Sequence, residues 1–194
     1  LTVEVLQLPR FSEMPALTTV IQEWTSHTPT YDVSIYTPIY YQHILASLRR
    51  IGIAFFLATA LGVPLGLLLG WSQTVRDYIF PVFETLRPIP ILAWVPLAII
   101  VFPGSEAPVL FLTFLASFFA TTLNTLLGVR SIDNSYLLAA QCLGASRRQL
   151  FRHVIVPGAL PFIFTGLQIS VGVAWFSLVA AEMVSGKYGL GYLI

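Results

Sequence analysis

Four stretches of the chain are apolar over about the length that a membrane crossing needs. They cover residues 51–69, 78–102, 109–129 and 159–184, and a helix needs roughly 20 such residues to cross a bilayer. Hydrophobic residues make up 56% of the chain and charged residues only 10%, which is too little charge for a water-soluble fold. Because no strand-like alternation is visible, we predict an all-α membrane bundle with four transmembrane helices.

The first 44 residues differ from the rest by their prolines (Pro9, Pro15, Pro29 and Pro38) and their tyrosines (Tyr31, Tyr36, Tyr40 and Tyr41). Tyrosine suits the headgroup layer of a membrane. We therefore predict an extramembrane or interfacial segment over residues 1–44 and one membrane domain over residues 45–194. Because the chain begins with Leu1 and shows no signal peptide, we expect it to be part of a longer protein.

Basic residues in the connections predict the orientation. The connection between the second and third spans, residues 103–108, has none. The long connection over about residues 131–156 is bordered or occupied by four: Arg130, Arg147, Arg148 and Arg152. The excess of positive charge places this long connection in the cytoplasm. Arg49 and Arg50, directly before the first span, oppose the assignment.

The long connection has the pattern of two short helices. Asp133 or Asn134 can cap the first, Gly144 interrupts it, and Ser146 can cap a second helix that runs toward Pro157. Small and apolar side chains around the break would let a partner protein approach closely: Ala139, Ala140, Ala145, Leu143, Leu150 and Phe151. An amphipathic helix held on the inner leaflet by its arginines fits the same residues. Both interpretations remain open at this point.

The segment that starts at Leu138-Ala139-Ala140, continues to Gly144 and ends at Val154-Ile-Val-Pro157 resembles the EAA motif of ABC importer permeases. That motif has a glutamate and two alanines, a glycine after three more residues, and an Ile-x-Leu-Pro after a further nine. Both alanines, the glycine, the proline and the spacing match. Leu138 stands at the position of the glutamate, and Val156 replaces the leucine, so one polar contact to a partner is in doubt.

The resemblance extends from about residue 42 to residue 194 and is strongest to permeases for nitrate, taurine and other aliphatic sulfonates. It rests on several segments: Gly62-Val-Pro-Leu-Gly66, Leu86-Arg87-Pro-Ile-Pro90, Trp94-Val-Pro96-Leu97, Pro157-Gly-Ala-Leu-Pro161 and Ala180-Ala-Glu182. It implies a multi-pass subunit of the bacterial inner membrane whose four spans form the centre of a type I ABC importer permease of six helices.

The resemblance also implies the partners and the mechanism. They are a separate ATPase that binds ATP and magnesium, a second permease subunit expected to be a copy of this chain, and an external solute-binding protein. The segment from Ala139 to Phe151 would be the coupling helix, which docks on the ATPase through these residues: Leu138, Ala139, Ala140, Leu143, Gly144, Ala145, Ser146, Leu150, Phe151 and Pro157. ATP-driven closure would then switch the permease between its outward- and inward-facing states.

Three glycines in the first span, Gly62, Gly66 and Gly70, form two consecutive GxxxG steps. We assign them to close helix packing. The second span holds Pro81, Pro88, Pro90 and Pro96, which fit either a kinked packing helix or a broken helix beside a pathway. Arg87 within it could face an anionic substrate, pair with Glu84, or lie near the cytoplasmic surface, which is the position we expect.

Two further spans carry polar faces. In the third, hydroxyls recur every four residues with Asn124 beside them: Thr113, Ser117, Thr121 and Thr125. In the fourth, one face holds Thr165, Gln168, Gly172, Trp175, Val179 and Glu182. Both fit helix packing or the lining of a pathway. The candidates for the pathway are Arg87, Thr121, Asn124, Gln168, Trp175 and Glu182. If the substrate is an anion, we expect Glu182 to pair with a cation or to serve a structural role.

Motifs of other functional classes are missing from the sequence. It has no phosphate-binding loop of the type G-x-x-x-x-G-K-[ST] and no H-E-x-x-H metal motif, so we expect no catalytic residue, metal or cofactor in this chain. The net charge of +1 gives no reason to expect nucleic acid. Two alternatives to an importer remain, a membrane scaffold whose basic helix rests on lipid and an ion-coupled secondary transporter.

Overall fold

The computed structural model describes residues 17–26, 36–185 and 187–193. Within them the chain is helical and contains no strand, as predicted. The larger helices are α1 (Leu17–Thr25), α2 (Pro38–Trp71), α3 (Gln73–Leu86), α4 (Val95–Val101), α5 (Glu106–Arg130), α6 (Asn134–Cys142), α7 (Arg147–Leu150) and α8 (Val156–Ser185). Short helical turns cover Ile91–Trp94, Phe151–Ile155 and Gly191–Leu193. Pro9, Pro15, Pro29 and Tyr31 lie outside the described residues.

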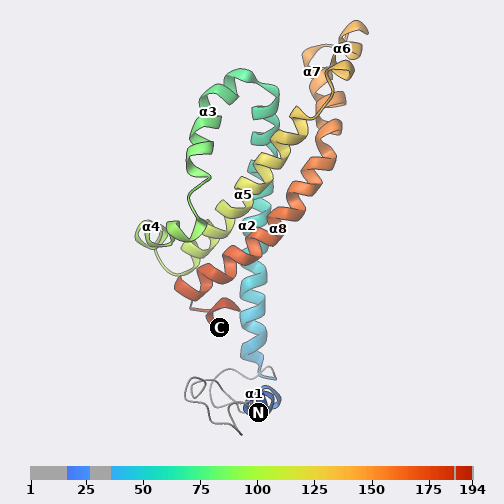
Figure 1. Ribbon diagram of the computed structural model, residues 1–194. Helices are drawn as coiled ribbons and strands as arrows, with labels where there is room; N and C mark the ends of the chain where they lie inside the picture. Colours follow the sequence, from blue (N-terminus) through green and yellow to red (C-terminus); the bar gives the residue numbers. More distant parts are fainter. Residues whose placement is uncertain (1–16, 27–35, 186, 194) are drawn as a thin grey trace.

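Three long helices form the bundle. Helix α5 packs along both α2 and α8, and all three run between the two ends of the molecule (Figure 1). Helices α6 and α7 lie at one end, and α4 lies near the other with residues 187–193. Helix α2 already begins at Pro38, so the predicted boundary at residue 44 falls inside a helix.

Three helical segments are apolar and long enough to cross a membrane: Pro38–Trp71, Glu106–Arg130 and Arg147–Val184. The predicted second span is a bent pair, Gln73–Leu86 with Ile91–Val101, whose two parts meet at 90°. Residues 78–102 are therefore not one helix, and the broken-helix interpretation of the prolines matches the structure. Pro88 and Pro90 fit the break because neither has an N–H donor to continue the helix.

The fourth span is longer than predicted, because α7, the turn Phe151–Ile155 and α8 form one continuous helical run. The turn is π-helical, and the Val156 N–H donates to the carbonyl of Phe151, five residues back. Pro157 follows directly. A proline is tolerated in the first turn of an α-helix, where its missing N–H removes little. Pro157 therefore lies inside the run, where a helix end was expected.

Glycines on α2 allow α5 to approach closely. A Cβ at Gly66 would lie 2.6 Å from the Thr122 carbonyl oxygen, and one at Gly70 would lie 2.4 Å from Val129 Cβ. At Gly62 the distance to Thr122 Oγ1 would be 3.1 Å. Distances below 3 Å are shorter than atomic contacts allow, so no Cβ fits at Gly66 or Gly70, and the contact at Gly62 is tight.

We expect Gly66→Ala to lower the free energy of unfolding by about 1–3 kcal/mol, because the added methyl group would push α2 away from α5. Gly52→Ala is the matched control on the same helix, since nothing lies within 4 Å of its Cβ position. Unfolding of both variants by sodium dodecyl sulfate in mild detergent measures the difference. Equal stabilities would contradict the packing described here.

Candidate functional site

The connection between α5 and α8 folds as a short helical hairpin, and we call residues 131–155 the α6–α7 hairpin. Asp133 caps α6: its side chain accepts a 2.8 Å hydrogen bond from the Ser135 N–H, which holds the pKa of the Asp133 carboxyl below its ordinary value. Ser146 and Gln149 form a capping box at the start of α7. Both predicted caps are confirmed, and the first helix begins at Asn134, slightly earlier than expected.

Gly144 makes the turn between α6 and α7. Its φ is +79°, in the left-handed region where a side chain is strained, and nothing lies within 4 Å of its Cβ position. Space is therefore plentiful at this residue, and the backbone conformation alone favours glycine. This placement confirms that Gly144 interrupts the helix.

The apolar side chains of the hairpin divide between an outer and an inner set. Leu143, beside the turn at Gly144, is 89% exposed, and Leu138 within α6 is 58% exposed. Leu150 is buried, and Phe151 packs against Trp71 of α2 with ring centroids 5.9 Å apart. Phe151 thus attaches the hairpin to the bundle, and the predicted contact of Leu150 and Phe151 with a partner protein stays a prediction.

The other predicted docking residues follow the outer set. Ala139, Gly144, Ser146 and Pro157 are exposed, and Ala140 and Ala145 are half-buried. The hairpin therefore presents small residues around two exposed leucines, with Arg147 and Arg148 beside them. An exposed apolar patch with a polar border is typical of a surface that binds another protein.

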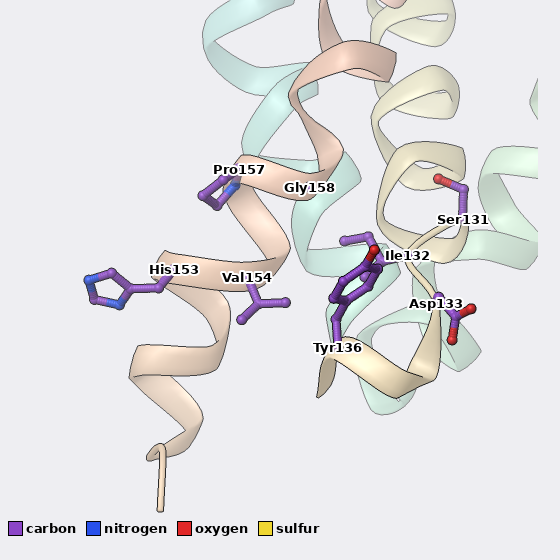
Figure 2. Close-up of a pocket in the computed structure, with 8 residues that line it drawn as sticks. All are labelled: Ser131, Ile132, Asp133, Tyr136, His153, Val154, Pro157 and Gly158. Atoms are coloured by element: carbon purple, nitrogen blue, oxygen red, sulfur yellow. The ribbon is translucent and has the colours of Figure 1, made fainter. Parts of the chain in front are cut away.

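Two cavities lie at the hairpin, one beside the start of α8 and one within the hairpin itself. One of about 530 Å³ is lined by Ser131, Ile132, Asp133, Tyr136, His153, Val154, Pro157 and Gly158. Figure 2 shows Tyr136 and Val154 facing each other across it, while His153 projects away. A second cavity of about 260 Å³ shares His153 and Val154 and extends to Leu143 and Gly144. Helix α6 therefore has room on its inner side.

The opposite end of the bundle is closed by charge. The Arg50 guanidinium donates to Glu182 at 2.7 Å through Nη1, and to Glu106 at 2.9 Å through Nε. Arg50 and Glu182 are both buried, while the Glu106 side chain is 61% exposed. This cluster joins α2, α5 and α8. It confirms that Glu182 pairs with a cation, and its complete burial removes Glu182 from any open pathway surface.

The same cluster holds residues 188–191 against α2. Ser47 Oγ donates to Glu182 at 2.8 Å and accepts from the Leu190 N–H at 2.9 Å. His43 Nδ1 accepts from the Gly189 N–H at 2.9 Å. Reasoning from the sequence did not identify His43, Ser47 or Glu106. Ser47 follows His43 by four residues, and Arg50 follows Ser47 by three, so the three residues lie on one helix face, and that spacing is the signal that was available.

The candidate pathway residues differ in their exposure in this chain. Thr121 is fully buried, Asn124 is half-buried, and Gln168 and Trp175 are exposed. In the hydroxyl stripe, Thr113 and Ser117 donate to carbonyls of their own helix, those of Val109 and Thr113. This is the bonding expected for helix packing.

Arg87 lies where α3 ends, at the break of the second span. Helix α3 has 14 residues and therefore covers roughly 21 Å. The expected position of Arg87 near the cytoplasmic surface stays a prediction. Arg87 and Asn124 line the same cavity, which also contacts α8.

Residues 62–194 match the family model of the "binding-protein-dependent transport system inner membrane component". The chain is 46% identical to the taurine transport system permease protein TauC of Escherichia coli K12 over 79% of its own length and 56% of that protein. It is 37% identical to the nitrate import permease protein NrtB of Synechocystis over 78% of its length and 55% of NrtB. The chain thus spans little more than half the length of these relatives.

A solved structure has the same fold. It is an inward-facing conformation of the MetNI methionine ABC transporter, which superposes with a TM-score of 0.68 over 79% of this chain and 77% of that chain. The sequences are 18% identical in the superposition. The likeness establishes the helical arrangement as that of a type I importer permease.

Arg50→Ala tests the charged cluster. It would leave the Glu182 carboxylate buried without its cation, and we expect a loss of about 3–5 kcal/mol in the free energy of unfolding. The neighbouring exposed Arg49→Ala should change stability by less than about 0.5 kcal/mol. Unfolding in detergent compares the two variants. A stable Arg50→Ala protein would show that the cluster does not hold the three helices together.

Proposed function

Because the chain belongs to the family of binding-protein-dependent transport system inner membrane components, we propose that it is the membrane-spanning permease subunit of an ATP-driven importer. The observation that carries the proposal is the α6–α7 hairpin, which presents exposed leucines and small residues at one end of the bundle. Such a surface needs a protein partner. A separate ATPase that binds ATP and magnesium would be that partner.

The helical run Arg147–Val184 suggests how movement would cross the membrane. A push on α7 would travel along one continuous helix to Glu182 at the far end, where α8 is tied to α2 and α5. Because Phe151 of the hairpin packs against Trp71 of α2, a movement of the hairpin would also move the bundle. Closure of the ATPases would in this way rock the permease between its two states.

The remaining assignments are also part of the proposal. The substrate would be a small oxyanion, nitrate or a sulfonate such as taurine, because permeases named for these two compounds share 37% and 46% of the aligned residues. A second copy of this chain would complete the pathway, and an external solute-binding protein would deliver the substrate. The hairpin would face the cytoplasm of a bacterial cell.

Co-purification and reconstitution test the function together. The full-length permease should bring down an ATPase with a phosphate-binding loop at stoichiometric level, and the complex should take up labelled nitrate or taurine only with ATP. A membrane scaffold would bring down no such ATPase. A secondary transporter would take up substrate on an ion gradient with no ATP present.

Gly144→Val should abolish uptake while the chain still inserts into the membrane, because valine strains the turn that shapes the docking surface. Gly104→Val is the matched control. Gly104 has a φ of +78° and free space at its Cβ position, but it lies in the loop before α5. Uptake and co-purification of the ATPase are measured for both. Normal uptake by Gly144→Val would count against coupling through the hairpin.

A further inference from the structure

A cavity of about 400 Å³ opens where the second span breaks. The break itself lines it through Arg87, Pro88, Ile89, Pro90 and Ile91. Helix α5 contributes Ala116, Phe119, Ala120, Leu123, Asn124 and Leu127, and α8 contributes Ile169 and Val173. The volume lies in the range of pockets that hold small molecules. The cavity is therefore a hollow between three different elements of the bundle.

Among the described residues that line this cavity, Arg87 alone carries a charge. Within the described residues its guanidinium forms no salt bridge. Glu84, the partner considered from the sequence, does not pair with it. Placing an unpaired guanidinium in a membrane span costs free energy. Because Arg87 forms no ion pair in this part of the chain, its five N–H donors are available to bind another group.

The surroundings of Arg87 favour an oxyanion. Asn124 uses one amide N–H to donate to the Ala120 carbonyl at 2.8 Å, and its second N–H is left for a ligand. The other walls are apolar, and a low dielectric strengthens the attraction between a guanidinium and an anion. The planar guanidinium also matches two oxygens of a nitrate, a sulfonate or a phosphate.

We propose that this cavity is an intramembrane subsite for the oxyanion group of the transported substrate, with Arg87 as its charged contact and Asn124 as a second donor. The inference rests on the proposed function. The break in the second span then has a role, because it places Arg87, at the end of α3, beside the cavity. The positive charge of Arg87 would repel a cation from the cavity.

Arg87→Gln in the assembled full-length transporter tests the subsite. We expect the uptake of labelled nitrate or taurine per ATP hydrolysed to fall roughly tenfold or more, the usual weight of a hydrogen bond to a charged group. Equilibrium dialysis against the permease–ATPase complex without binding protein should show a similar rise in Kd. Arg87→Lys keeps the charge but loses the planar pair of N–H donors, so its Kd should lie between those of the wild type and Arg87→Gln. Arg76→Gln, on the same helix, should behave as the wild type.

The outcomes separate the two proposals. Failure of the wild type to import with ATP would refute the proposed function. Import by the wild type together with unchanged uptake and Kd in Arg87→Gln would overturn the subsite alone. If Arg87→Gln does not assemble, Arg87→Lys is used instead. The subsite proposal is then overturned if Arg87→Lys binds the anions and a neutral analogue with the same Kd. An effect that disappears in vesicles without anionic lipid would assign Arg87 to lipid headgroups and would also overturn it.

Discussion

The buried ion pair between Arg50 and Glu182 is the interaction on which the arrangement of the bundle depends. It closes one end of three helices that otherwise meet through small and apolar side chains. The buried guanidinium and carboxylate are tolerated because their charges neutralise each other. The Ser47 hydroxyl and the Gly191 N–H donate further hydrogen bonds to the Glu182 carboxylate. No comparable cluster ties the hairpin end within the described residues. The molecule is thus fastened at one end and open to a partner at the other.

This pair also bears on the orientation. Arg50 opposed the assignment of the hairpin to the cytoplasm when basic residues were counted along the sequence. Its charge is balanced inside the bundle by Glu182 and Glu106, so it does not act as a free charge in a connection. Among the described residues, Arg49 and Lys187 are exposed at that end, against Arg147, Arg148 and Arg152 on the hairpin. The balance of free charges still favours the cytoplasmic hairpin.

Local features could be predicted from the sequence, and distant pairings could not. The caps at Asp133 and Ser146 depend on a few neighbouring residues, and the GxxxG steps need only the period of one helix. The partners Arg50 and Glu182 stand 132 residues apart, and no spacing rule joins them. Prolines marked the second span as irregular, but the 90° bend also depends on where α4 packs. Nothing in the sequence around Phe151 revealed that its ring packs against Trp71 of α2.

The π-helical turn at Phe151–Ile155 lets the buried face of α8 and the outward face of α7 be set independently along one helical run. An α-helix advances by roughly 100° per residue, so the buried face of α8 would normally determine which side of α7 faces outward. A turn with a wider hydrogen-bond ring takes up one additional residue and changes that angular register. The hairpin can therefore present Leu143 outward while Ile155 and Ala159 remain in the core. Removing a single residue from the turn would rotate the entire outer surface about the axis of α8.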